Sequence, residues 1–316
     1  ELPAVLPPPG MRSLQAAGAR VTPATHPYLA HHVIQGRTVL PLAQSLEWIL
    51  AAARAWNPAA AALTLRDVRV LLPAYWEATD TQDREFTLHG TSTTNGTNGT
   101  NETNGAADPG SLTVELRGAG GRVHCRAFVA VDDGPAGAPP PVPAETDAPA
   151  LPPWERGEIY DGAVLFHGPL LHALTSVEGM GPAGARATLA GAAALGWPGD
   201  TGQTDLAAVD GALQLAVLWA PEVLGGAALP MSVGTFRLHH RGLANGPVTC
   251  TLQAVRAEGS AAWCHLRLTG EDGVPFADLS DVGLIRRPDG LPSPLPATSP
   301  APEGPPSDEG RDTSGL

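Results

Sequence analysis

The chain has 316 residues, of which 43% are hydrophobic, and its 32 acidic residues outnumber 19 basic ones, all Arg, to give a formal net charge of -13. The hydrophobic fraction supports packed cores, so the chain as a whole is not disordered, and the length suits two domains. The acidic balance argues against a broad surface that binds nucleic acid or anionic membranes. The sequence has no run of 18 apolar residues, so we predict no membrane span.

The N-terminus and the cysteines together indicate a compartment. The first ten residues, ELPAVLPPPG, have neither a basic start nor an apolar run, so we expect no secretory signal. Cys125, Cys250 and Cys264 match no metal-binding spacing and lie in alternating segments, so we expect three small buried thiols. A reducing cytoplasm is the expected location.

Three segments poor in large apolar residues divide the chain. Residues 91–110 are an Asn/Gly/Thr tract that predicts a flexible insert in a hairpin. Residues 132–153 hold eight prolines and four acids, which predicts an extended linker, and residues 288–316 hold eight prolines and five acids, which predicts a disordered tail. Two bodies remain, 1–131 and 154–287.

The first body contains one strongly periodic helix. Pro41–Ala55 carries apolar residues spaced three or four apart, and we place Pro41 in the first helical turn, where its missing N–H is not needed. Alternating segments then predict strands near 65–72, 84–90, 111–118 and 122–131.

The second body repeats this order. Asp205–Trp219 is apolar nearly all round, which is typical of a buried helix, and strands are predicted near 232–240, 247–256, 262–270 and 276–286. A central helix wrapped by an antiparallel sheet, present twice, predicts an α+β fold of the double-hotdog kind, although other α+β sandwiches share the pattern.

A histidine cluster precedes the first helix. His26, His31 and His32 have no carboxylate or Cys at ligand spacing, so we expect no metal, and a general base or a solvated loop remains. The string from His32 through Gly36 to Pro41 fits H-x-x-x-G-x-x-x-x-P, which resembles the active-site motif of the dehydratase domains of polyketide and fatty acid synthases. His31 misses this spacing by one residue.

The second helix supplies a partner motif. Asp210 and Gln214 fit the family's D-x-x-x-Q pattern and, being four apart, share one helix face. Burial raises the pKa of a carboxyl group, as a general acid near neutral pH requires. The alternative is that Asp210 lies in the first turn and interacts with the helix dipole.

Two further segments resemble family motifs in part. Tyr160, followed by His167-Gly168-Pro169, resembles the G-Y-x-Y-G-P-x-F motif, with Leu171 at its last aromatic position. The segment from Leu229 to Val233 resembles L-P-F-x-W, with Met231 and Val233 in place of Phe and Trp. These replacements predict a substrate tunnel that is differently lined or roomier, and the residues expected to line it are Leu171, Leu229, Pro230, Met231 and Val233.

The resemblance implies a mechanism. A (3R)-hydroxyacyl thioester on an acyl carrier protein would lose its α-proton to His32 and its β-hydroxyl, as water, with a proton from Asp210, leaving a 2-enoyl thioester. Gln214 would orient Asp210, and the backbone N–H of Gly168 would bind the thioester oxygen. No metal or organic cofactor is implied beyond the phosphopantetheine arm of the carrier. The supporting positions of the motifs are Gly36, Pro41, Tyr160, His167 and Pro169.

Alternatives stay open on the same scaffold: an enoyl isomerase, a product-template cyclase, or an inactive dimerising domain. The run after Pro41 looks more like dehydratases of polyunsaturated fatty acid synthases than like those of modular synthases. The expected partners are an acyl carrier protein, neighbouring synthase domains and a second copy in a homodimer. Carrier docking would use Arg286–Arg287 or Arg237–Arg241, which could equally be solvated strand ends, or tethering alone.

Overall fold

The structure is a computed structural model that describes residues 11–15, 18–93, 112–132, 151–198 and 202–287. Most of the expected insert, linker and tail falls outside these residues, so their predicted flexibility stays a prediction. The parts that are described change two boundaries. Thr91–Thr93 continue a strand, and Pro153 forms a β-bridge with Gly179, so the end of the expected linker belongs to the second body.

Helix α1 (Leu42–Trp56) forms the centre of the first body. Pro41 is its N-cap, with extended backbone (φ -61°, ψ 146°), and not a residue of the first turn as expected from the sequence. A proline at this boundary costs no hydrogen bond and fixes the direction in which the helix starts. The apolar face, including Leu46 and Ile49, is fully buried against β5, β7, β8 and β9.

Antiparallel strands wrap this helix. In spatial order they run from β1 through β7, β8 and β9 to β5, with β2 also pairing with β7. Their bounds are β1 Met11–Gln15, β2 Ala19–Val21, β5 Ala62–Val70, β7 Arg84–Thr93, β8 Leu112–Arg117 and β9 Val123–Asp132.

The second body repeats the arrangement around α2 (Leu206–Trp219), which is followed by the short α3 (Pro221–Leu224). The stretch Leu206–Leu224 is long and apolar enough to cross a membrane by composition, yet 78% of the window is buried inside the structure. It is therefore the core helix of this body. The strands are β10 Leu174–Gly181, β11 Gly184–Leu189, β12 Ala228–Leu238, β13 Val248–Glu258, β14 Ala261–Thr269 and β15 Pro275–Arg286.

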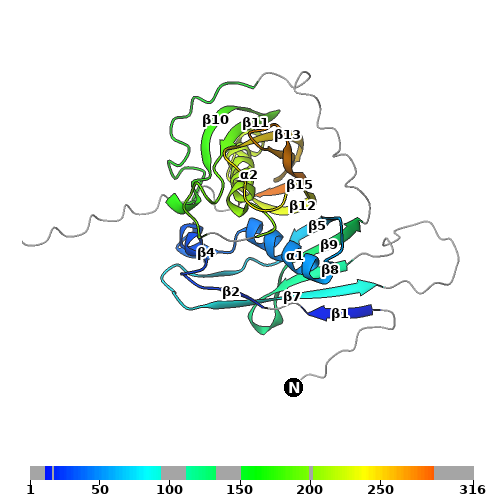
Figure 1. Cartoon of the computed structure of the whole chain (residues 1–316). Coiled ribbons are helices and arrows are strands. Elements are labelled where there is room, and N and C mark those ends of the chain that lie inside the picture. Colours follow the sequence, from blue (N-terminus) through cyan, green and yellow to red (C-terminus); the bar gives the residue numbers. More distant parts are fainter. Residues whose placement is uncertain (1–10, 16–17, 94–111, 133–150, 199–201, 288–316) are drawn as a thin grey trace, which may run out of the picture.

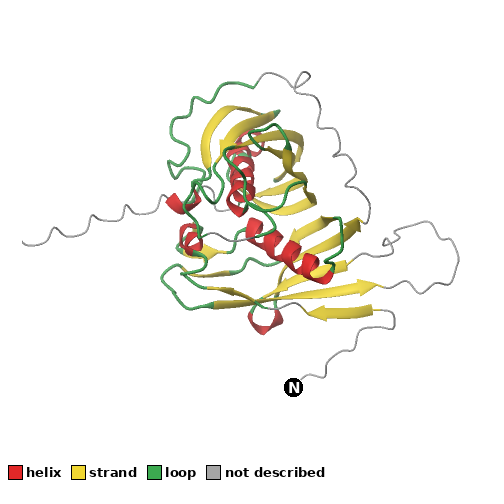
Figure 2. Cartoon of the chain, viewed as in Figure 1, coloured by secondary structure: helices red, strands yellow, loops and turns green. Residues whose placement is uncertain are grey.

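The two half-sheets join edge to edge. Strands β5 and β12 pair antiparallel, with Leu65 opposite Phe236, and the result is one continuous sheet from β1 to β10 (Figures 1 and 2). Helices α1 and α2 lie on the same face of this sheet and contact each other. The double-hotdog prediction is confirmed.

A small sheet stands apart at the start of α1. It consists of β3 (Val33–Ile34), β4 (Arg37–Val39) and β6 (Tyr75–Glu77), and a short 3-10 helix, η1 (Pro27–His31), leads into it. This sheet carries the first histidine motif.

Candidate active site

The β3–β4 hairpin explains the spacing of the first motif. Gln35 (φ 51°) and Gly36 (φ 78°) form its two-residue turn, and two positive φ values are what a type I′ hairpin turn requires. The turn brings Val39 back beside His32: the Val39 N–H donates to the His32 carbonyl at 3.0 Å. Two residues later Pro41 is the N-cap of α1. His32 therefore precedes the hairpin, Gly36 lies in its turn, and Pro41 follows its second strand.

The same hairpin orients the His32 ring. Nδ1 of His32 lies 2.6 Å from the Val39 carbonyl oxygen, which can only accept, so Nδ1 carries the proton and Nε2 keeps a free lone pair. Burial lowers the pKa of His32 to about 4. The side chain is thus a neutral imidazole at neutral pH, in the form that a general base needs.

Asp210 lies in the second turn of α2 and not in the first. Asp205 is the N-cap that accepts from the Ala208 N–H, so the dipole alternative for Asp210 is wrong. Asp210 is 4% exposed, and burial raises its pKa to about 6, with the hydrogen bond from Gln214 acting in the opposite direction.

Gln214 holds Asp210 through a fully satisfied amide. Its Nε2 donates to Asp210 Oδ2 at 2.7 Å and to the Leu171 carbonyl at 2.8 Å, and its Oε1 accepts from the Tyr160 hydroxyl at 2.7 Å. Tyr160 in turn accepts from the Leu174 N–H and stacks on His172. Tyr160 therefore acts behind Gln214 and does not line the cavity described below.

His167 lies between the two catalytic candidates. It forms a backbone β-bridge with His32, their ring centroids are 5.1 Å apart, and its Nε2 is 4.0 Å from Asp210 Oδ2. Burial lowers the pKa of His167 well below the usual range, and Phe166 stacks on its ring. Phe166 was missed in the sequence, although it is adjacent to the motif histidine.

The expected role of Gly168 is not supported. Its backbone N–H donates to the His31 carbonyl at 2.8 Å, so it is engaged in joining the two bodies and is not available to a thioester oxygen. Pro169 follows it as the first residue of a short 3-10 helix, η4 (Pro169–Leu171).

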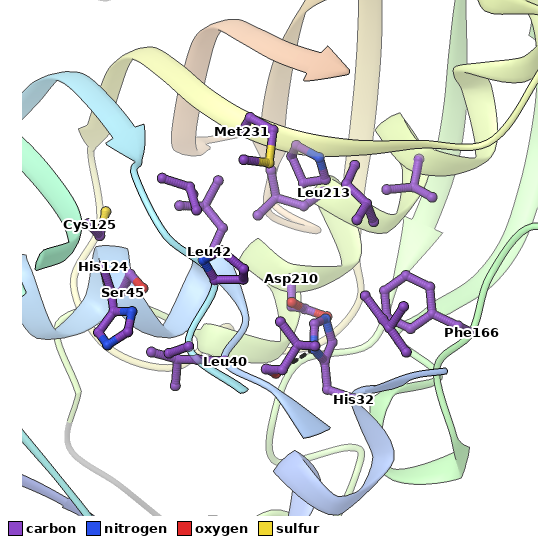
Figure 3. A pocket seen from close by; sticks show the side chains of 18 of the residues that line it. His32, Leu40, Leu42, Ser45, His124, Cys125, Phe166, Asp210, Leu213 and Met231 are labelled. Atoms are coloured by element: carbon purple, nitrogen blue, oxygen red, sulfur yellow. Dashed lines mark hydrogen bonds between the residues drawn. The ribbon is translucent and has the colours of Figure 1, made fainter. Parts of the chain in front are cut away.

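His32 and Asp210 point into one cavity of about 210 Å³ between the two bodies (Figure 3). Of the expected tunnel residues, Leu229, Pro230 and Met231 line it. Leu171 and Val233 do not: both are buried in the core instead, so their assignment to the tunnel was wrong. The lining residues that the sequence did not suggest include Leu40, Leu42, Ser45, Leu72, His124, Cys125, Phe166, Leu213 and Val217.

The cysteine prediction is confirmed. Cys125, Cys250 and Cys264 are buried free thiols in strands β9, β13 and β14. Burial raises the pKa of Cys125 to about 12, so the thiol that touches the cavity is protonated and a poor nucleophile.

The sequence of the first body matches a family model. Residues 6–99, which include the whole His32 hairpin and α1, match the model of the polyketide synthase dehydratase domain. The predicted resemblance to these dehydratases is confirmed. No curated protein sequence matches the chain.

Solved dehydratase domains share the fold over nearly the whole chain. The dehydratase domain from the CurF module of curacin polyketide synthase is 16% identical with a TM-score of 0.65, and covers 91% of this chain and 96% of its own. GphF dehydratase 1 is 18% identical with a TM-score of 0.58, covering 89% and 95%. A bifunctional dehydratase-cyclase domain of ambruticin biosynthesis is 18% identical with a TM-score of 0.60, covering 85% and 91%. At such identities these dehydratase structures establish the double-hotdog fold.

Proposed function

We propose that this chain dehydrates a (3R)-hydroxyacyl thioester, presented by an acyl carrier protein, to a 2-enoyl thioester within a cytoplasmic polyketide synthase. The observation that carries the proposal is the shared cavity, in which burial keeps His32 neutral and raises the pKa of Asp210 to about 6, so that a protonated carboxyl group is accessible near neutral pH. One base and one acid facing the same small volume suit the removal of water across a carbon–carbon bond.

The protons balance as follows. His32 Nε2 takes the α-proton as the electron pair moves to form the double bond, and the β-hydroxyl leaves as water with the proton of Asp210. Because Gln214 already donates to Oδ2 of Asp210, that proton sits on Oδ1. The products are an imidazolium and a carboxylate, whose attraction in a dry cavity offsets the burial of both charges. Transfer of a proton from His32 back to Asp210 restores the starting state.

The negative charge that builds on the thioester oxygen needs a donor other than Gly168. The start of α1 offers one: Pro41 provides no capping side chain, and Leu42, the first helical residue, lines the cavity. The first N–H groups of a helix have no partner within it and carry the positive end of the dipole. We assign the thioester oxygen to this helix start.

The cavity volume bears on the alternatives. About 210 Å³ is small for a folded poly-β-keto chain, which argues against a product-template cyclase. A double-bond isomerase could use the same His32 and Asp210. Because the two enoyl isomers have the same mass, the position of the double bond in the product has to be read by NMR. Kinship with polyunsaturated fatty acid synthases remains a prediction, since the structures compared above belong to polyketide synthesis.

The test measures loss of water from a 3-hydroxyacyl carrier protein by mass spectrometry, with both hydroxyl configurations. His32→Ala and Asp210→Asn are expected to lower turnover by at least about 10³-fold, with circular dichroism unchanged. His31→Ala is the matched control, because His31 is adjacent but lies outside the cavity lining, and it should keep most of the activity. Wild-type turnover in His32→Ala would overturn the proposal.

A further inference from the structure

The cavity at His32 and Asp210 ends at His124. Its volume of about 210 Å³ lies below the roughly 300–1,000 Å³ of sites that hold drug-sized ligands, so it fits only a short acyl unit. In Figure 3, His124 and Cys125 lie at one end and Phe166 at the other, with Asp210 and His32 between them.

A second hollow begins where the cavity ends. It has a volume of about 750 Å³, and both hollows are lined by His124 and Ala74. Its walls come from β6, β7 and the turn between β8 and β9. The two spaces are therefore neighbours that share one wall.

His124 is one of the two residues that line both hollows. Its Nδ1 donates to the Leu72 carbonyl at 3.1 Å, and its ring meets the edge of Phe86. The position facing the ring must be glycine: a Cβ on Gly118 would lie 2.5 Å from His124 Nε2. The imidazole is thus fitted closely between Phe86 and Gly118.

The walls of the second hollow suit an uncharged chain with oxygen substituents. Trp76 and Phe86 supply apolar surface. Three of the five charged residues that line the hollow are in ion pairs: Arg84 with Asp80, Arg117 with Glu115, and Asp83 with Arg20. A phosphate site needs several arginines free of such partners, and only Arg122, which is exposed, lies outside these pairs. An acyl chain that bears hydroxyl or keto groups needs only scattered polar contacts among apolar ones.

We propose that the His124 side chain separates the cavity from the second hollow and so sets the length of acyl chain that the enzyme accepts, the second hollow being space that a longer chain would need. This inference rests on the proposed dehydration. It assigns to His124 a role in specificity and none in the proton transfers.

The experiment compares four-carbon and ten-carbon 3-hydroxyacyl pantetheine thioesters. In His124→Ala the two hollows merge, and the ratio of kcat/KM for the long over the short substrate should rise by about tenfold or more. In His124→Phe the wall is retained without its polar contact, and the ratio should not rise. His89→Ala, a histidine substitution on β7 outside both hollows, should leave the ratio unchanged. A ratio in His124→Ala within twofold of wild type would overturn the inference.

Two further experiments distinguish a wrong subsite assignment from a wrong assignment of the reaction. In the first, the pantetheine arm of the thioester is shortened to N-acetylcysteamine while the acyl group is held constant. If His124→Ala or Arg122→Ala changes the preference for the arm and not for acyl length, the hollow binds the carrier arm and the inference is wrong. Calorimetric binding of a non-reactive ten-carbon acyl thioester needs no chemistry. Tighter binding to His124→Ala together with no water loss in wild type would refute the dehydration and retain the subsite.

Discussion

His32 and Asp210 are buried in the same cavity, and burial acts on them in opposite directions. It disfavours the imidazolium of His32, whose pKa falls to about 4, and the carboxylate of Asp210, whose pKa rises to about 6. Between about pH 4 and pH 6 both groups are therefore mainly in their uncharged forms. That form is the base for a histidine and the acid for an aspartic acid, so one environment prepares both roles.

The resulting pH dependence has a definite sign. His32 must have lost its proton, so kcat/KM should rise as pH increases through about 4; Asp210 must hold its proton, so kcat/KM should fall above about 6. The amide of Gln214 donates to the Asp210 carboxylate and stabilises its charge. Gln214→Met removes that stabilisation, and the alkaline limb should move to higher pH. An alkaline limb that stays in place would show that another group controls it.

The His32 and Asp210 positions could be predicted because the spacing of each motif resembles that of a known family, and local geometry fixes each spacing. The distance from His32 to Pro41 is one hairpin, and the step from Asp210 to Gln214 is one helical turn. The partner of the Gly168 N–H could not be predicted in this way. Its acceptor, His31, lies in the other body and approaches only when the two bodies pack.

The β3–β4 hairpin is the element on which the base depends, and Gly36 is its sensitive position. Nothing lies within 4 Å of a Cβ placed on Gly36, so a substitution there acts through the backbone and not through a clash. At φ 78° a β-branched residue is strained by about 1–2 kcal/mol. Gly36→Val should therefore shift the turn, loosen the bond from His32 to Val39 and lower kcat/KM by about tenfold.

Gly36→Asn is the control for that prediction, since asparagine tolerates positive φ in such turns. It should keep kcat/KM within about threefold of wild type. Thermal unfolding of both variants reports the strain separately from the kinetics. Equal loss in the Asn and Val variants would mean that the side chain at Gly36, and not the turn conformation, matters.

Strands β10 and β11 show where sequence patterns fail at the level of elements. Leu174–Gly181 pairs with Gly184–Leu189 through two register shifts, and its buried residues do not alternate regularly. The segment is also rich in glycine and alanine, which carry little strand preference. By contrast, β14 alternates strictly between buried and half-buried residues and was predicted to within a residue.

The chain as a whole is more continuous than two bodies joined by a linker. The pairing of β5 with β12 depends on which strand edges remain free once each helix is covered, and no local pattern of either strand encodes it. The seam nevertheless decides function, because the cavity takes residues from both sides of it. A carboxylate of α1 also bonds there to the segment that leads into α2.

Glu47 of α1 is that carboxylate, and it is 8% exposed. Its oxygens accept from the Gln203 N–H at 2.6 Å, the Thr204 N–H at 2.8 Å and the Thr204 hydroxyl at 2.7 Å, just before α2 begins. Glu47→Gln would set an amide N–H against these donors, and we expect the free energy of unfolding in urea to fall by about 2–3 kcal/mol. Glu77→Gln, at an exposed ion pair with Arg37, should cost less than about 1 kcal/mol.

Because one sheet runs through both bodies, each variant should unfold in a single transition with an unchanged m-value. Two separate transitions in Glu47→Gln would show that this carboxylate, and not the sheet, makes the molecule unfold as one unit.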